Sequence, residues 1–378
     1  MEYPVPCIII KKMKYYTAKA GIGTGLIALT ILLAAYCSSA PADYPQQQDR
    51  EAELQLDEIE AAFEEEIIEE EEPPIELLPV GADLPVSTFR EIWGYVIAGR
   101  ESSLSRNFPL TDVVYFNAEV DSYGKLTGVP RRRNITFSGR VHFSVTCGSR
   151  SLTHFVLAPG SNERKELIDD LLTAARDYDG LQIDFENVPA RDGEAFLSFL
   201  SELRSGLGNK FFTIALPART SRIANDVYDY EKIKPYVDRI LVMAYDEHWS
   251  GSTPGSVASL QWCRRVADYS LRAIGQEKLI MGLPFYGRAW GDSNPSRALI
   301  YTTTESIIRD QKVTEIRREN GIPTFDYDVL VKVKVYYEDV YSLSSRMEMY
   351  RTMNVRSIGF WRIGQEPTAI WRLLTLER

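Results

Sequence analysis

Short apolar runs rich in β-branched residues recur along the chain from about residue 88. They span residues 92–99, 112–120, 141–147, 181–186, 211–218, 240–246, 279–287 and 357–364. Most are separated by stretches with apolar residues at helical spacing, such as 161–178 and 192–207. Strands that are apolar on both faces and separated by helices indicate a parallel sheet covered by helices.

The number of runs indicates the fold class. Eight runs within residues 88–378 match an α/β fold, the (β/α)8 TIM barrel, which typically needs about 250 residues. The interval 288–356 is too long for one helix, so we predict a small α+β insertion between strands 7 and 8, followed by the last barrel helix. The alternative is an open doubly wound sheet, but no Gly-rich phosphate turn follows the first run.

Two carboxylates interrupt the fourth run, in the segment DGLQIDFENVP at residues 179–189. Gln182, Asp184 and Glu186 alternate along the strand, so they share one face with successive Cα atoms ~6.5 Å apart. In a barrel this face points inward, with Glu186 nearest the mouth, where catalytic groups gather. Crowded acids raise the pKa of one carboxyl, as a general acid at neutral pH requires. The alternatives are a structural ion pair or a metal site, but the strand has no basic residue and one Gln with two acids suits magnesium poorly.

Composition narrows the classes of partner. The chain has a net charge of -10, which argues against nucleic acid. A neutral polymer such as a glycan is compatible, and the 21 Tyr, 15 Phe and 6 Trp suit one. The four cysteines (7, 37, 147 and 263) form no CxxC pair, and there are three His without clustered ligands. We therefore expect no metal site and no cofactor.

The N-terminal segment 1–37 resembles a bacterial export signal, with a Lys-rich start, an apolar run and then Cys37. A Cys in this place is typical of a lipoprotein signal, in which Cys37 is lipidated, although Tyr36 departs from the small residue usual before it. The alternatives are an uncleaved anchor, since the run is slightly shorter than a span of ~20 residues, and a secreted leader. Met13 lies where such a signal normally begins, so either Met1 or Met13 is the start. We expect an exported, membrane-anchored lipoprotein of the cell envelope.

Residues 38–87 form a polar spacer and then a nearly pure acidic run, EAELQLDEIEAAFEEEIIEEEEPP. Such a block repels itself and stays extended or only partly helical. We predict a disordered linker that holds the barrel off a membrane. A calcium site is the alternative, but no loop spacing supports it.

Four motifs, in order, resemble glycoside hydrolase family 18, the chitinase family. The segment DGLQIDFE (179–186) is similar to its DGxDxDxE signature, and LVMAYDEHW (241–249) to its sixth-strand Met-x-Tyr-Asp motif. MGLPFYGRAW (281–290) resembles the seventh strand, and 336–366 the closing segment with its Trp. Details of YDEHWSGSTPG and YEDVYSLSSR resemble the branch of bacterial spore-cortex N-acetylglucosaminidases.

The resemblance implies a role for each matching residue. Glu186 corresponds to the acid that protonates the glycosidic oxygen, Asp184 to the group that orients the substrate's 2-acetamido group, and Tyr245 to the hydroxyl that holds its carbonyl. In this family the acetamido oxygen attacks the anomeric carbon, which gives an oxazolinium intermediate and retention of configuration. Met243, Asp246 and Trp361 would line the same subsite.

Gln182 departs from the family pattern, which most commonly has Asp there. An amide can still hydrogen-bond Asp184 but removes one negative charge, so we expect a smaller rise in the pKa of the acid pair and a lower pH optimum. Other candidates for contact with glycan, with barrel packing as the alternative, are Tyr286, Arg288, Tyr95, Trp93, Phe285, Trp290, Trp249 and His248. We expect His142 and His154 to be structural.

These features together predict a monomeric hydrolase of β-1,4-linked glycans that contain N-acetylglucosamine, either peptidoglycan or chitin-type chains. The alternative from another class is a lectin-like binder, but such members of the family typically lack the acid at the position of Glu186. A third possibility, an adhesion lipoprotein with the barrel as a scaffold, has no sequence feature in its favour.

Overall fold

The computed structural model describes residues 75, 77–291, 296–328 and 332–377. The predicted signal segment 1–37, with Cys37, and the predicted linker up to residue 74 lie outside the described residues. Within the described part of the chain, no helix is both long and apolar enough to cross a lipid bilayer.

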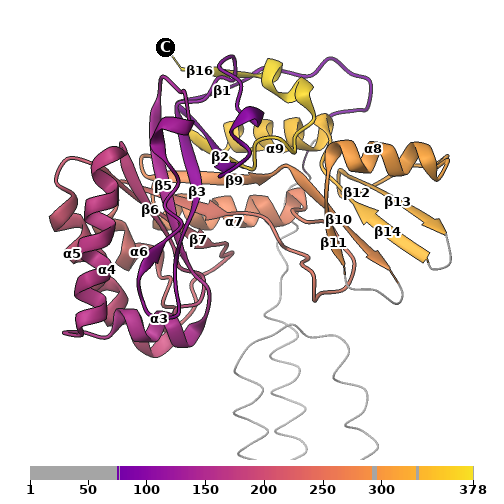
Figure 1. Cartoon of the computed structure of the whole chain (residues 1–378). Coiled ribbons are helices and arrows are strands. Elements are labelled where there is room, and N and C mark those ends of the chain that lie inside the picture. The colour runs from indigo at the N-terminus through magenta and orange to yellow at the C-terminus, as the bar shows by residue number, and fades with distance from the viewer. Residues whose placement is uncertain (1–74, 76, 292–295, 329–331, 378) are drawn as a thin grey trace, which may run out of the picture. The chain divides into compact units, whose positions relative to one another are not determined.

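In this described part, eight parallel strands close into a barrel (Figure 1). They are β2 (Glu91–Ile97), β3 (Asp112–Val120), β5 (Arg140–Cys147), β6 (Gly180–Asp184), β7 (Phe211–Pro217), β8 (Arg239–Met243), β9 (Leu279–Pro284) and β15 (Ser357–Trp361). β2 pairs with both β3 and β15, which closes the ring, and the short β4 (Leu126–Thr127) extends β3 as a hairpin. The predicted (β/α)8 fold is confirmed, because each apolar run overlaps one barrel strand.

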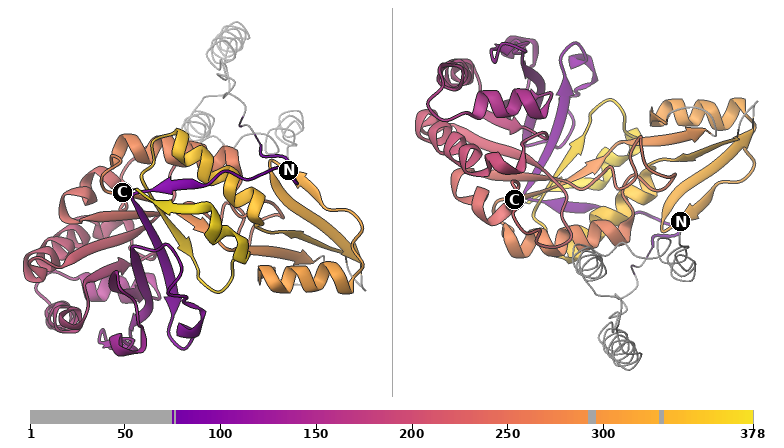
Figure 2. Two further views of the ribbon diagram at one scale, coloured as in Figure 1. Left: turned by 90° about the horizontal axis from the view of Figure 1, so that it is seen from above. Right: turned by 90° about the horizontal axis from the view of Figure 1, so that it is seen from below.

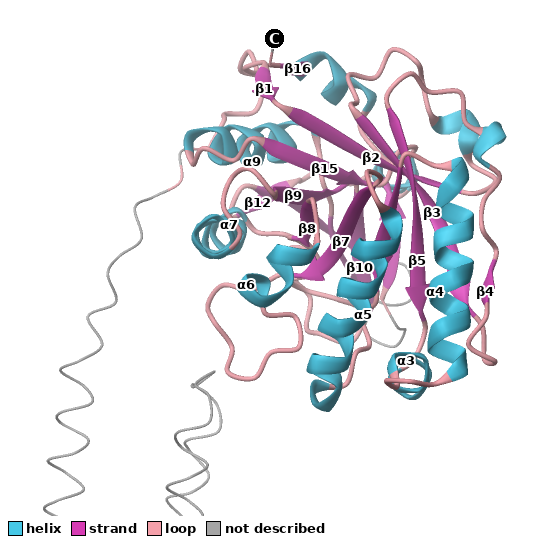
Figure 3. Cartoon of the chain, turned by 90° about the vertical axis from the view of Figure 1, so that its left-hand side faces the viewer, coloured by secondary structure: helices cyan, strands magenta, loops and turns pink. Residues whose placement is uncertain are grey.

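Helices cover the outside of the barrel (Figure 3). They are α3 (Arg150–Leu157), α4 (Asn162–Ala174), α5 (Gly193–Leu207), α6 (Tyr230–Ile233), α7 (Leu260–Ala273) and α9 (Val340–Thr352). α4 begins after Ser161, whose side chain accepts a hydrogen bond from the N–H of Arg164 and caps the helix. α5 buries Phe196, Phe199 and Leu203 on one face, at helical spacing. Burial of each such side chain contributes roughly 1.5–3 kcal/mol.

The insertion between strands 7 and 8 is an antiparallel sheet with one helix, as predicted, and lies at one side of the barrel (Figure 2). Its elements are β10 (Tyr286–Gly291), β11 (Arg297–Ile300), α8 (Tyr301–Asp310), β12 (Arg317–Glu319), β13 (Ile322–Asp328) and β14 (Lys332–Tyr336). The expected strand boundary at residue 287 is too late: β9 ends at Pro284, and Tyr286 already pairs with β11. An apolar run does not show where the chain passes from one sheet to another. Gly287 permits the passage, because a Cβ there would lie 2.4 Å from the carbonyl oxygen of Tyr336.

The inside of the barrel has an apolar middle layer and a charged base. The middle layer contains Trp93, Tyr95, Val114, Ala215, Leu241 and Ile280. At the base, where the strands begin, Glu91 accepts from Arg239. Asp112 accepts from Arg140, and its Oδ1 lies 2.7 Å from Nε2 of His142. Trp93 lies between the two layers, because its ring stacks on His142 at 4.7 Å and its Nε1 donates to Glu91. Both Trp93 and His142 therefore have structural positions, away from the strand ends that carry the predicted site.

The sequence predicts that the barrel domain begins at residue 88. In the structure the chain already contacts the barrel domain before that residue. The N–H of Gly81 donates to Oη of Tyr341 at 2.9 Å. β1 (Ser87–Phe89) then pairs in parallel with β16 (Leu374–Leu376), which brings the two ends of the described barrel chain together.

Candidate active site

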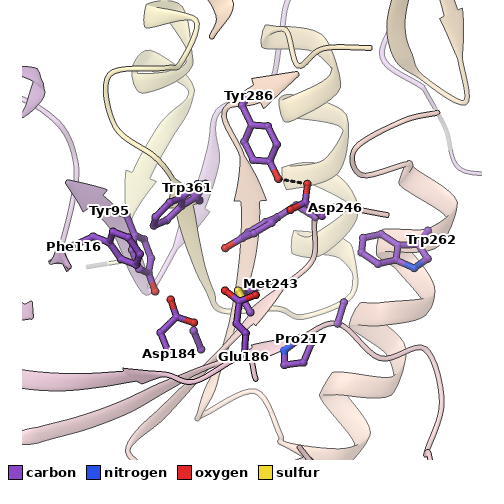
Figure 4. A pocket seen from close by; sticks show the side chains of 13 residues that line it. Tyr95, Phe116, Asp184, Glu186, Pro217, Met243, Asp246, Trp262, Tyr286 and Trp361 are labelled. Carbon is purple, nitrogen blue, oxygen red and sulfur yellow. Dashed lines mark hydrogen bonds between the residues drawn. The ribbon is translucent and has the colours of Figure 1, made fainter. Parts of the chain in front are cut away.

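A pocket of about 440 Å³ lies at the C-terminal ends of the barrel strands (Figure 4). It is lined by Tyr95, Phe116, Asp184, Glu186, Ala215, Pro217, Ala218, Met243, Tyr245, Asp246, Trp262, Tyr286 and Trp361. The structure thus brings most of the predicted site residues together from β2, β6, β8, β15 and the insertion. Their functional roles stay predictions at this point.

Side chains outside the barrel fix the end of the strand that carries the acid pair. Asp184 ends β6, and Glu186 follows two residues later, with both carboxyl groups on the pocket side. Between them, Phe185 points outward and stacks on Phe199 of α5, with ring centroids 5.9 Å apart. Oη of Tyr228 donates to the carbonyl of Phe185 at 2.8 Å and accepts from the N–H of Val188 at 2.9 Å. The alternation predicted for this strand is confirmed.

Burial determines the electrostatics of the acid pair. Asp184 is only 6% exposed, and its Oδ1 has no hydrogen-bond partner among the described residues. Burial, and then the negative charge of Glu186, raise the pKa of Asp184 to about 8. Glu186 is exposed to the pocket, yet partial loss of water and then the charge of Asp246 raise its pKa as well. At pH 7 the pair therefore retains a proton, as general acid catalysis requires.

Gln182 contacts other partners than the one expected. Its Oε1 accepts from Oη of Tyr95 at 2.6 Å, and its Nε2 donates to Oγ1 of Thr213 at 3.2 Å. Among the described residues the expected hydrogen bond to Asp184 is not formed, because Gln182 is in register with Thr213 on the neighbouring strand. Gln182 therefore lies below the pocket and orients Tyr95, and its effect on the pH optimum stays a prediction.

The insertion fixes one wall of the pocket. Asp246 follows β8 with a positive φ of 59°, and its Oδ1 accepts from Oη of Tyr286 at 2.6 Å. Nη2 of Arg288 lies 3.4 Å from the same oxygen, so Arg288 acts on the pocket through Asp246 without lining it. Tyr245 packs against Gly282 of β9, where a Cβ would lie 2.9 Å from the tyrosine ring. Glycine at this position thus makes room for Tyr245.

The opposite wall is aromatic. The ring of Trp361 packs against Tyr95 and, edge on, against Phe116, with centroids 5.3 and 4.7 Å apart. A sugar can stack its CH face on such a surface. Five lining residues were not predicted from the sequence: Phe116, Ala215, Pro217, Ala218 and Trp262. Phe116 shares its strand parity with the inward Val114, which is the one sequence signal for it.

Several candidates lie elsewhere. Phe285 packs in the core outside the barrel, and Trp290 is buried in β10. His248 contacts the carbonyl of Thr253, and Trp249 is 56% exposed in the loop after β8. His154 contacts Asp192. Cys147 and Cys263 are buried free thiols. Among the described residues no group of three or more potential metal ligands occurs.

Comparison with known proteins places the chain in a family. The model of glycosyl hydrolases family 18 matches residues 92–366. The uncharacterized glycosylase YvbX of Bacillus subtilis (strain 168) is 31% identical over 224 residues, 56% of this chain and 65% of that protein. The cortical fragment-lytic enzyme of Bacillus anthracis is 26% identical over 290 residues, 70% of this chain and 67% of that enzyme. The chain thus spans about two thirds of the length of these two relatives.

Solved structures show the same fold. The spore cortex-lytic enzyme SleL of Bacillus cereus superposes with a TM-score of 0.71 at 22% identity, over 80% of this chain and 79% of SleL. A class V chitinase from Nicotiana tobaccum gives a TM-score of 0.60 at 19% identity, over 76% of this chain and 97% of the chitinase. The family match runs from β2 to beyond β15 and includes every residue that lines the pocket, so the chain belongs to glycosyl hydrolases family 18.

Proposed function

We propose that this protein is a retaining glycoside hydrolase that cleaves β-1,4-linked glycans containing N-acetylglucosamine, with the substrate's own acetamido group as the nucleophile. One observation carries the proposal. Asp184 and Glu186 lie on the same strand face, both with raised pKa values, in a pocket whose opposite wall is aromatic. A glycan binder without catalysis would not need a carboxyl with a raised pKa at the position of Glu186.

In the first step, Glu186 donates its proton to the glycosidic oxygen as the bond from that oxygen to the anomeric carbon breaks. The acetamido carbonyl oxygen of the same sugar forms a new bond to the anomeric carbon, which gives an oxazolinium ion. Oδ1 of Asp184, which has no hydrogen-bond partner among the described residues, accepts the N–H of this group, and Oη of Tyr245 donates to the acetamido oxygen. Buried groups placed this way stabilise charge that develops in the transition state.

In the second step, the Glu186 carboxylate takes a proton from water, and the resulting hydroxide adds to the anomeric carbon and opens the oxazolinium ring. Two successive inversions at that carbon give net retention of configuration. Trp361 and Tyr95 belong to the aromatic wall, against which the sugar packs during both steps.

The proposed setting is the cell envelope, with peptidoglycan as the substrate and a lipid on Cys37 as the anchor. The relatives that are named as cortex enzymes support peptidoglycan, and the N-terminal sequence supports the anchor. Mass spectrometry of the membrane fraction tests the anchor directly: a peptide that begins at an unmodified Cys37, or that continues upstream through it, would contradict lipidation.

Cleavage is tested with the full-length protein, soluble peptidoglycan strands and chitin oligomers, and the new reducing ends are quantified. Glu186→Gln is expected to lower kcat roughly 10²–10⁴-fold, the usual contribution of a general acid. Asp170→Asn, on the exposed surface of α4, is the matched control and should keep the wild-type rate. NMR of the first product should show the β-anomer. An active Glu186→Gln variant would disprove the acid assignment, and an initial α-anomer would disprove retention.

A further inference from the structure

A second cavity lies beside the catalytic pocket, where β5 and β6 end. Its volume is about 290 Å³, and it is lined by Arg150, Ser151, Pro189, Ala190 and Arg191. Pro189 follows Glu186 by three residues, so their Cα atoms lie within about 11 Å of each other. Arg150 follows Thr146 by four residues, and Thr146 is the register partner of Asp184. The cavity therefore adjoins the acid pair along the mouth of the barrel.

The guanidinium groups of Arg150 and Arg191 give this cavity a positive charge. Both side chains are exposed, and neither forms an ion pair within the part of the chain that the structure describes. The nearby carboxylate of Asp192 contacts His154 instead, and both of its oxygens lie 2.9 Å from Nδ1 of His154. This contact also joins α3 to the 3-10 turn η5 (Ala190–Asp192), so it holds the two arginines on adjacent elements.

An anionic substrate needs such a site. The catalytic pocket contains the carboxyl groups of Asp184, Glu186 and Asp246, which disfavour a second anion at close range. Cations at the edge of the pocket offset this repulsion. The chain's net charge of -10 does not exclude an anionic substrate, since residues 51–72 alone carry twelve Asp and Glu and no Lys or Arg.

We propose that Arg150 and Arg191 form a subsite for a carboxylate carried by the glycan, and that the enzyme acts on peptidoglycan in preference to chitin-type chains. This inference rests on the proposed glycosidase function. Guanidinium binds carboxylate through paired, charge-assisted N–H···O bonds. Peptidoglycan carries carboxylates on its lactyl ethers and stem peptides, whereas chitin is neutral. Arg150 and Arg191 thus distinguish between glycans that share the same β-1,4 backbone.

The test compares the double variant Arg150→Gln/Arg191→Gln with wild type on three substrates: soluble peptidoglycan strands, the same strands with their carboxylates converted to neutral amides, and chitin oligomers. For the intact strands KM is expected to rise roughly three- to tenfold, because two charge-assisted contacts at an exposed site are lost together. kcat, and KM for the two neutral substrates, should stay unchanged, because the arginines bind the carboxylate of the substrate and do not contact its reacting atoms. The wild-type preference for intact strands should also fall at high salt.

The matched control is Arg131→Gln/Arg133→Gln, which removes two exposed arginines from a different cavity, lined also by Ala174 and Tyr178. It should behave as wild type on all three substrates. Equal losses on all substrates, or no change on intact strands, would overturn the carboxylate subsite. Binding of each substrate to the Glu186→Gln variant separates the two proposals. Tighter binding of intact than of amidated strands supports the subsite even if no cleavage is found, whereas absent cleavage by wild type overturns only the hydrolase.

Discussion

Replacement of Asp184 by Asn should stabilise the fold even though it removes a group to which we assign a role in catalysis. The pKa of Asp184 is about 8 in the folded protein because the carboxyl is buried, with no partner for Oδ1 among the described residues, and lies near Glu186. In the unfolded chain it is about 3.9. The folded state therefore binds the extra proton between these values. The stability that this group contributes is complete below about pH 4 and is lost as the pH rises towards 8.

The size of the effect follows from the two pKa values. At pH 7 the difference in proton binding corresponds to a destabilisation of roughly 4 kcal/mol by the native Asp184. Asn has the same shape and does not ionise, so the variant should recover about 2–4 kcal/mol, the lower figure allowing for the coupling with Glu186. In a domain of this size about 1 kcal/mol moves Tm by roughly 2 °C, so we expect Tm to rise by about 4–8 °C at pH 7.

Calorimetry of both proteins at pH 4 and pH 8 measures this. The difference in Tm should be large at pH 8 and small at pH 4. Asp112→Asn is a control of opposite sign: burial opposes ionisation of Asp112, but hydrogen bonds from His142 and Arg140 outweigh it and lower its pKa. That variant should lose stability. A Tm for Asp184→Asn at or below wild type at pH 8 would refute the reasoning.

Three further substitutions test residues that surround the pocket. Gly282→Ala should lower kcat at least about tenfold in steady-state assays, because its Cβ would lie 2.9 Å from the ring of Tyr245; wild-type kcat would show that Tyr245 has no fixed role. Tyr286→Phe removes a 2.6 Å hydrogen bond to Asp246 and should lower kcat/KM about tenfold; an unchanged value would mean that this carboxyl needs no anchor. Gln182→Asp adds a buried acid and should move the pH–rate profile of the acid pair to higher pH; a shift to lower pH would contradict the electrostatic reasoning.

The barrel could be predicted from the sequence because its strands are buried on both faces. Runs such as 141–147 and 240–246 are apolar along most of their length, which is typical of parallel strands covered by helices. The end of β9 could not be predicted, because Phe285 and Tyr286 are equally apolar on either side of the change from one sheet to the other. That change depends on pairing with β11 and β14, which lie later in the chain.

The placement of site residues on a single strand could be predicted from the sequence. Contacts between residues of different strands could not. Asp184 and Glu186 are two positions apart, so period-2 geometry alone places them on one face. The partners of Gln182 depend on the register with Thr213 and on the reach of Tyr95 across the barrel, and neither is encoded locally. Trp262 was missed for the same reason, since it enters the pocket from the first turn of α7.

The hydrogen bond and ion pair from β10 to Asp246 make the insertion part of the pocket. A barrel trimmed of residues 286–336 would lose both anchors of this carboxyl at once. For protein engineering, the insertion is therefore not a cassette that can be exchanged freely between relatives. A transplanted insertion must bring a hydroxyl and a guanidinium to the same point on the pocket wall, or the recipient barrel will keep its fold and lose its turnover.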